Sequence, residues 1–339
     1  MERPLTDLPP LRYLAASDVV AAMPPLAERL ALAEATLRGL AREAELPPKI
    51  GVHPRPGGAF GHAMPAYLPG ADDTGEADLV GMKWVLGYPT NTALGLPGIH
   101  ATLLLSHPVT GVPIAVMDAS PITAERTAAI SGVAVRAWAP RVAGRPPSAA
   151  IIGAGVQGSS HVAVLGHVLP GVQLRIFDRD PARAGSLAAD AIRTPGVHAA
   201  TVAGSARAAV DGADVVVTAA SFVPAPERQV MTNDWLAPEV LVVPIDYATY
   251  CAAEVARDAV LFLVDHREQF LANREAGLFE GYPDPSAMMG EALDGTSGRG
   301  RHAGRVVAMH LGTGLADVVF GSAILATAEA RGLGTLLPR

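Results

Sequence analysis

The chain has 339 residues, of which 50% are hydrophobic and 17% are charged, and this length provides enough apolar material for two domains with their own cores. The formal net charge of −7, without any basic run, argues against nucleic acid or an anionic membrane as a partner. No stretch reaches the ~18 uninterrupted apolar residues of a membrane-spanning helix, the first residues lack a signal-peptide pattern, and we expect a cytoplasmic globular protein. The single cysteine, Cys251, permits no internal disulfide and no Cys-x-x-Cys site, and no metal site is predicted.

Hydrophobic spacing predicts helices on both sides of a strand-rich region in the first 140 residues. Residues 18–46 have helical spacing, interrupted by one proline pair and ended by another, because proline disfavours helix in the residue before it. Residues 49–119 contain short apolar runs, two of which flank a Pro-Val-Thr-Gly turn and predict a β-hairpin. A Ser-Pro pair then starts a helix that should run from residue 120 through Arg126 and stop before Pro140.

The pattern of apolar residues changes after a second proline-rich boundary near residue 147. Short apolar runs alternate with helix-compatible stretches, which predicts a parallel sheet with helices on both faces. The expected strands are residues 149–153, 172–178, 213–218, 240–245 and 259–264. Residues 286–308 are rich in glycine and arginine and should form a loop and a short helix, and residues 314–331 should form an alanine-rich helix.

The most specific local signal is a Gly-x-Gly-x-x-Gly motif between the first of these strands and the helix after it. Its residues are Gly153, Gly155, Val156, Gln157 and Gly158. The first glycine permits the tight turn, the second lets the backbone approach a pyrophosphate, and the third allows close packing of helix on strand. The pyrophosphate lies at the helix N-terminus, where free N–H groups favour an anion. We therefore predict a Rossmann dinucleotide site.

An acidic residue at the expected distance completes this fingerprint. Asp178 ends the next strand, 20 residues after the last glycine, and would accept hydrogen bonds from the ribose hydroxyls. This favours NAD, because the 2′-phosphate of NADP would meet a like charge. Arg179 and Arg183 leave NADP open, since either guanidinium could bind that phosphate. Thr218, at the end of the third expected strand, and Arg126 are the remaining predicted cofactor contacts.

Four further segments occur in a characteristic order along the chain. They are residues 49–67, which end in Met-Pro-Ala-Tyr; residues 81–97, with Gly-Met-Lys and a later Asn-x-x-x-Gly-Leu-Pro; residues 110–128, with Met-Asp and Thr-Ala-x-Arg-Thr-Ala; and residues 312–317, which read Gly-x-Gly-x-x-Asp. With the glycine motif, they resemble the ornithine cyclodeaminase/mu-crystallin family over nearly the whole chain from about residue 45.

This resemblance implies a split architecture. Residues 1–127 and 308–339 would form an α+β substrate-binding and dimerisation domain, built from the N-terminal segment and the C-terminal helix. Residues 128–307 would form the Rossmann domain, an α/β doubly wound parallel sheet, and the helix carrying Arg126 would bridge the two. The resemblance also implies a homodimer that binds NAD(H) or NADP(H) and acts at the C–N bond of small α-amino or α-imino acids.

The family holds its substrate carboxylate with three basic residues. Lys83 and Arg126 match two of them, and Lys49 stands where arginine is usual; Met64 belongs to the same implied substrate site. Independently of the resemblance, a carboxylate in a dry cleft needs paired cations. The chain contains 24 arginines and only these two lysines. A lysine inside an apolar strand therefore indicates a requirement for a compact ammonium at position 83, which Lys83→Arg would test.

Asp246 ends an expected strand and matches the family's catalytic aspartate. Its carboxylate could accept a proton from the substrate amine or return one in the reverse reaction. Two residues depart from the pattern. His62 replaces a glutamate that would pair with the second amine of a diamino acid, and His310 replaces a serine or similar residue beside the nicotinamide. These departures are either neutral or mark a changed substrate, with another carboxylate or a ring.

Three functions remain open from the sequence. The first is an amino acid dehydrogenase, imine reductase or opine-type enzyme. The second is an ornithine- or lysine-type cyclodeaminase, in which an internal amine attacks, ammonia leaves and the hydride returns. The third is a mu-crystallin-like protein that binds NADP and a small ligand without catalysis. The joint presence of Lys83, Arg126 and Asp246 favours an enzyme, because a binding protein needs no catalytic carboxylate.

Overall fold

The computed structural model describes residues 8–71, 74–295 and 303–339, and the chain divides into two compact units. Unit 1 consists of Met1–Arg126 and Thr313–Arg339, and unit 2 consists of Thr127–Gly312. The helix α3 (Ser120–Trp138) contains the first point of division. The predicted domain boundaries, 127/128 and 307/308, lie within five residues of this division.

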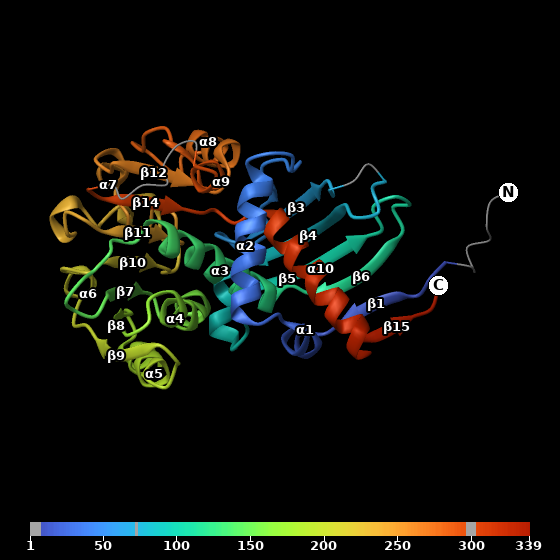
Figure 1. Ribbon diagram of the computed structural model, residues 1–339, viewed down its shortest axis with the longest axis horizontal. Helices are drawn as coiled ribbons and strands as arrows, with labels where there is room; N and C mark the ends of the chain where they lie inside the picture. Colours follow the sequence, from blue (N-terminus) through green and yellow to red (C-terminus); the bar gives the residue numbers. More distant parts are fainter. Residues whose placement is uncertain (1–7, 72–73, 296–302) are drawn as a thin grey trace. The chain divides into compact units, whose positions relative to one another are not determined.

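Unit 2 is built on an eight-stranded parallel sheet with the order β13-β12-β14-β11-β10-β7-β8-β9 (Figure 1). Because β7 lies between β8 and β10, the strand order reverses at β7, and doubly wound sheets bind ligands at the carboxyl ends of such strands. The strands are β7 (Ser148–Ile152), β8 (Val172–Phe177), β9 (Val197–Val202), β10 (Val215–Thr218), β11 (Leu241–Pro244), β12 (Leu261–Val264), β13 (Ala287–Met288) and β14 (Val306–Met309).

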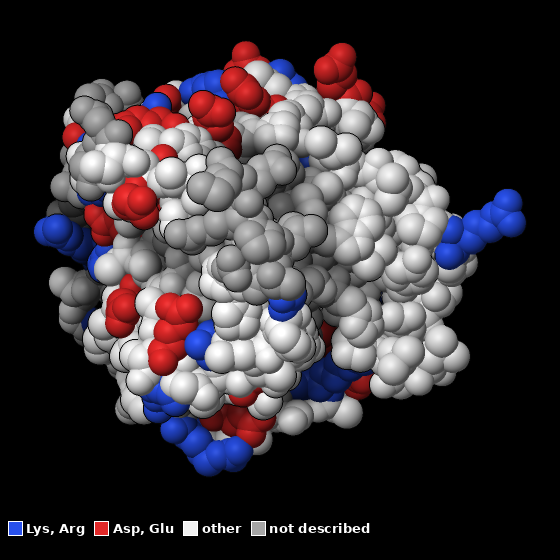
Figure 2. Space-filling model, turned by 90° about the vertical axis from the view of Figure 1, so that its right-hand side faces the viewer, with Lys and Arg blue, Asp and Glu red and all other residues white. Residues whose placement is uncertain are grey.

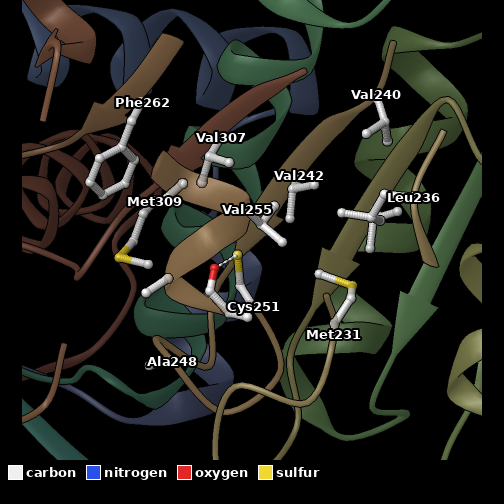
Figure 3. Packing of buried hydrophobic residues seen from close by; sticks show 14 of the residues in the cluster. Met231, Leu236, Val240, Val242, Ala248, Cys251, Val255, Phe262, Val307 and Met309 are labelled. Atoms are coloured by element: carbon white, nitrogen blue, oxygen red, sulfur yellow. Dashed lines mark hydrogen bonds between the residues drawn. The ribbon is translucent and has the colours of Figure 1, made fainter. Parts of the chain in front are cut away.

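Helices cover this sheet, and its central strands are buried on both faces. Every residue of β10, β11, β12 and β14 is buried, which explains their nearly continuous valine and leucine runs. Figure 3 shows part of this core, in which the buried Cys251 lies among Val255, Met231 and Ala248. The helices are α4 (Val156–Val168), α5 (Pro181–Ala191), α6 (Ala206–Val210), α7 (Ala253–Arg257), α8 (Arg267–Glu275) and α9 (Met289–Leu293).

Unit 1 is a seven-stranded sheet with the order β15-β1-β6-β5-β4-β3-β2. Its pairs are antiparallel except β1 with β6, and α10 packs against β3, β4 and β5 (Figure 1). A Cβ on Gly314, the first residue of α10, would collide with the carbonyl oxygen of Met64, so glycine permits this close approach. The elements are β1 (Leu11–Leu14), α1 (Ala16–Ala22), α2 (Leu26–Leu40), β2 (Ile50–Val52), β3 (Phe60–Leu68), β4 (Leu79–Gly87), β5 (Ile99–Ser106), β6 (Pro113–Asp118), α10 (Gly314–Arg331) and β15 (Thr335–Leu337).

The structure confirms the predicted Rossmann sheet with an accompanying α+β unit, and it corrects part of the element prediction. The hairpin of β5 and β6 and the helix at 314–331 are observed as expected. The expectation of only loop and short helix at 286–308 is wrong, because β13 and the first residues of β14 lie there; residues 296–302 lie outside the described part. In the described residues, no helix has the length and apolar character needed to cross a membrane.

Candidate active site

A buried cluster of charges lies where α10 and the start of α3 meet β4 in unit 1. Lys83 Nζ lies 2.6 Å from Asp317 Oδ2, and Arg126 Nε lies 3.2 Å from Asp317 Oδ1. The side chains of Lys83 and Asp317 are 1% and 0% exposed, so this carboxylate separates two cations away from solvent. Thr123 Oγ1, one turn before Arg126, is 3.4 Å from Lys83 Nζ. Two cations and one carboxylate leave an uncompensated positive charge, which suits an anionic ligand.

The environment of Lys83 makes its ammonium easy to deprotonate. The pKa of Lys83 is lowered to about 7: burial is the largest cause, the charges of Arg126 and Lys49 act in the same direction, and Asp317 opposes them. An anion bound nearby would stabilise the ammonium and raise this pKa again. Binding of an anion there would therefore be coupled to protonation of Lys83.

The other predicted substrate residues lie on the same face of the unit 1 sheet or near it. Met64 is paired with Lys83 across β3 and β4, and His62 precedes it by two residues, so their side chains share one face. Lys49 precedes β2, and its charge lowers the pKa of both His62 and Lys83. Burial is the largest cause of the low pKa of His62, about 4, so this imidazole is neutral at neutral pH. Its ring stacks on Phe60 at a centroid distance of 4.7 Å.

The glycine motif in unit 2 forms the turn between β7 and α4. Gly153 has φ +103°, and a Cβ there would lie 2.5 Å from the carbonyl oxygen of Ala219. A Cβ on Gly158 would collide with the carbonyl oxygen of Gly153, whereas a Cβ on Gly155 would meet open space. Gly155 is also the N-cap of α4 and has no side-chain capping bond. The turn therefore presents an accessible helix N-terminus, which fits a pyrophosphate.

Asp178 links the end of β8 to this turn. Its Oδ2 accepts a hydrogen bond from the backbone N–H of Ala154 at 2.7 Å, and its Oδ1 accepts one from Asp180 at 2.8 Å. The carboxylate therefore lies at the carboxyl edge of the sheet beside the glycine turn. Arg179 is exposed, and Arg183 pairs with Asp180 at 3.5 Å, which places both arginines in the same region.

Asp246 follows β11 at the same edge and is 2% exposed. Its Oδ1 accepts a hydrogen bond from Thr218 Oγ1 at 2.6 Å, and its Oδ2 accepts one from the Ala220 N–H at 3.2 Å. Burial raises the pKa of Asp246 to about 7, although both hydrogen bonds oppose this shift. A carboxyl group that ionises near neutral pH is suited to general acid–base catalysis. Thr218 thus orients Asp246, a role that the sequence did not predict.

His310 follows β14, the neighbour of β11 in the sheet, and is buried. Its Nε2 lies 2.8 Å from Ser131 Oγ on α3. The predicted residues thus form two sets: Lys49, His62, Met64, Lys83 and Arg126 in unit 1, and the glycine motif, Asp178, Thr218, Asp246 and His310 in unit 2. Within the residues that the structure describes, no group of three histidine, cysteine, aspartate or glutamate side chains could hold a metal ion.

Sequence reasoning missed the role of Asp317. It was visible as the last residue of the Gly-x-Gly-x-x-Asp motif, but an aspartate in the first turn of an apolar helix also serves the helix dipole. Its complete burial against two cations became evident only from the packing of α10 on β4. Asp265 was also missed; it accepts hydrogen bonds from the backbone N–H groups of Leu311 and Gly312, beside His310.

A doubly wound parallel sheet, with a glycine turn at its switch point and a titratable buried carboxyl at the same edge, defines a dinucleotide-dependent enzyme of the Rossmann class. Residues 14–329 match the ornithine cyclodeaminase/mu-crystallin family, and the chain belongs to that family.

Three similar proteins illustrate the range of this family. The nodulation efficiency protein NfeD of Rhizobium meliloti is 36% identical over 333 residues, which cover 97% of this chain and 98% of NfeD. The ketimine reductase mu-crystallin of Mus musculus is 29% identical over 239 residues, 68% of this chain and 69% of the mouse protein. A solved structure of Thermococcus litoralis Δ1-pyrroline-2-carboxylate reductase, in complex with NADH and L-proline, has a TM-score of 0.82 and 24% identity, covering 96% of this chain and 100% of that chain.

Proposed function

We propose that this chain is an NAD(P)-dependent oxidoreductase that interconverts a small α-amino acid and its α-imino acid. The observation that carries the proposal is the buried carboxyl of Asp246, whose pKa of about 7 allows it to accept and donate a proton at the ligand-binding edge of a Rossmann sheet. The reactions named for mu-crystallin and for the Thermococcus litoralis enzyme, reduction of a ketimine and of a cyclic imino acid, support this chemistry.

The residues at the glycine turn fit a dinucleotide. The uncapped start of α4 and the open space at Gly155 would receive the pyrophosphate, and Asp178 would bind the adenosine ribose. Asp178 favours NAD, and the nearby Arg179 keeps NADP as the second candidate. A bound nicotinamide supplies the hydride acceptor for amine oxidation or the donor for imine reduction.

Lys83 and Arg126 would bind the substrate carboxylate. One carboxylate balances the positive charge that Asp317 leaves uncompensated in this buried cluster, and Lys49 adds a further cation near it. Binding by two side chains on different elements would also fix the orientation of the α-carbon. This orientation is a condition for directional hydride transfer.

Asp246 would accept a proton from the substrate nitrogen and return it in the reverse reaction. In the oxidative direction the carboxylate would take a proton from the α-ammonium, so that the free amine can become an iminium as Cα gives up its hydride to the cofactor. In the reductive direction the carboxyl group returns this proton to nitrogen. Thr218 and the Ala220 N–H hold the carboxylate oxygens in place for either step.

The surroundings of His62 favour this reaction over cyclodeamination of a diamino acid. His62 is neutral, and the positive charges of Lys49 and Lys83 act on the same place. A second ammonium on the substrate would be repelled there, whereas a neutral or acidic side chain would not. The preferred substrate is therefore a small amino or imino acid without a distal amine.

A homodimer is part of the proposal. The face of the unit 1 sheet opposite Lys83 carries large apolar side chains that remain only half-buried: Met82, Trp84, Leu86, Leu104 and Val116. Figure 2 shows a broad area with hardly any charged side chains on the right of the view. A second copy would cover such a face, and Trp84→Glu should convert a dimer to a monomer in sedimentation experiments.

The deciding experiment measures two products with a panel of α-amino acids. Net formation of NADH or NADPH together with a keto acid supports the oxidoreductase. Release of ammonia without net change of the nucleotide would instead identify a cyclodeaminase. If the wild type binds NADH but turns over no substrate in either direction, the result would favour the binding protein. Asp246→Asn should abolish turnover while retaining NADH binding.

A further inference from the structure

Four groups of unit 2, carried by α3, α4 and the segment after β14, form a continuous buried hydrogen-bonded relay. His310 Nε2, after β14, lies 2.8 Å from Ser131 Oγ on α3, and this oxygen lies 2.8 Å from His161 Nε2 on α4. His161 Nδ1 then lies 2.6 Å from the carbonyl oxygen of Gln157, in the first turn of α4. Ser131, His161 and His310 are each at most 1% exposed.

The direction of every hydrogen bond in the relay follows from its carbonyl end. A carbonyl oxygen only accepts, so His161 carries its proton on Nδ1. Burial lowers the pKa of His161 to about 4, and the neutral ring therefore has a lone pair on Nε2. The Ser131 hydroxyl must donate to that lone pair, and its oxygen then accepts from Nε2–H of His310. The chain is thereby set to one tautomer of His310, with Nδ1 as its basic atom.

The relay cannot conduct a proton to solvent, because it ends at a carbonyl that holds no transferable proton. What it can do is orient its members. Apolar side chains could fill this space without the need to provide hydrogen-bond partners for two buried imidazoles. A buried polar network defines one arrangement only when every member has its hydrogen bonds. An orienting role accounts for a complete relay.

His310, at the end of the relay opposite the Gln157 carbonyl, lies in a turn that other hydrogen bonds also hold in place. Asp265 Oδ2 accepts hydrogen bonds from the N–H groups of Leu311 at 3.0 Å and of Gly312 at 2.9 Å. The Tyr247 hydroxyl donates to the carbonyl of Leu311 at 2.9 Å. Tyr247 directly follows Asp246, and β11 and β14 are neighbours, so His310 and the proposed acid–base group end adjacent strands.

We propose that Ser131 and His161 are positioning residues that hold His310 in its Nε2–H tautomer and so give the reaction site a fixed hydrogen-bond acceptor at Nδ1 beside Asp246. The relay also joins this acceptor to the first turn of α4, where the pyrophosphate is expected to bind. This inference rests on the proposed function for the meaning of the site, but the tautomer itself is a property of the ligand-free protein.

The test combines histidine-ring ¹⁵N NMR of the full chain with steady-state kinetics. Ser131→Ala removes the hydroxyl that serves both histidines, and Ser131→Thr retains it. Ser160→Ala is the matched control, because Ser160 Oγ donates to the same Gln157 carbonyl at 2.9 Å without taking part in the relay. His310→Gln identifies the His310 signals by their loss. If Ser131→Ala does not fold, His161→Leu breaks the relay at its next member.

The wild type should show protonated Nε2 on His310 and protonated Nδ1 on His161. Ser131→Ala should mix the two tautomers of His310 and lower kcat at least fivefold, with the KM for NADH changed less than twofold. Ser131→Thr should restore both, and Ser160→Ala should change neither. A wild-type His310 protonated on Nδ1, or Ser131→Ala with unchanged tautomer or unchanged kcat, overturns the proposal. If no substrate turns over, the proposed function fails, and the NMR result alone decides whether the relay exists.

Discussion

Asp317→Asn tests the buried charge cluster most directly, because it removes one charge with almost no change in volume. Arg126 cannot deprotonate, so it becomes an uncompensated buried cation. Breaking a buried pair in this way costs about 3 kcal/mol or more. We expect this part of the loss in the free energy of unfolding at every pH, since a guanidinium always keeps its charge and the asparagine that replaces Asp317 carries none.

Lys83 adds a second, pH-dependent part. In the wild type its pKa in the folded state is about 7, below the unfolded value of 10.5, and loss of Asp317 lowers the folded value further. Above pH 7 neither folded protein keeps the proton on Lys83, so the gap between wild type and variant is constant. Below pH 7 only the wild type keeps it, and the gap should widen by up to about 1.4 kcal/mol per pH unit.

Urea unfolding followed by circular dichroism at pH 5.5, 7.0 and 8.5 measures both parts. With Lys83→Met introduced into both the wild type and Asp317→Asn, the gap between the two should lose its dependence on pH and keep only the constant part. Asp190→Asn is the control, because Asp190 pairs with Arg193 at the surface and its loss should change the free energy by less than about 0.5 kcal/mol. A gap of the same size at all three pH values would refute our description of Lys83.

Three further predictions concern the proposed reaction. For amino acid oxidation, kcat/KM should rise with pH as Asp246 loses its proton near pH 7 and should fall as Lys83 loses its own, which gives a narrow optimum near neutrality. For imine reduction the decrease of kcat/KM at low pH should disappear, because Asp246 must then be protonated. Gly155→Ala should fold normally but bind NADH at least tenfold more weakly, whereas Gly158→Ala should lower Tm, as its Cβ meets backbone. Asp178→Ser should raise the NADPH-to-NADH ratio of kcat/KM at least tenfold if the carboxylate selects NAD.

Local patterns were sufficient to predict most of the fold. The helix at 314–331 and the strands around the glycine motif depend on spacing within short windows, and both were observed. β1 and β15 were not predicted, because each consists of three or four residues whose pairing partner lies at the other end of the chain. β14 was missed because its apolar run follows a segment rich in glycine and arginine, which reads as loop.

The sequence suggested which residues are candidates for the site, but not which side chains they contact. Lys83 and Arg126 could be named as candidates from motifs, and Asp246 also from its place after a strand. The pairing of Lys83 with Asp317 joins positions 234 residues apart and exists only because α10 packs on β4. The relay through Ser131 depends in the same way on the meeting of α3, α4 and the end of β14. Tertiary contacts of this kind leave no periodic signal in the sequence.

These contacts explain why lysine is retained at position 83 in a chain with 24 arginines. Nζ fits between Asp317 Oδ2 at 2.6 Å and Thr123 Oγ1 at 3.4 Å, in a space closed to solvent and already shared with the guanidinium of Arg126. A second guanidinium would bring five donors that this space cannot satisfy and a charge that cannot be neutralised. An ammonium can lose its proton while no anion is bound and would regain it if the proposed substrate carboxylate bound beside it. Lysine therefore allows the protein to bury two basic side chains with a single carboxylate as long as the carboxylate of the proposed substrate is not bound.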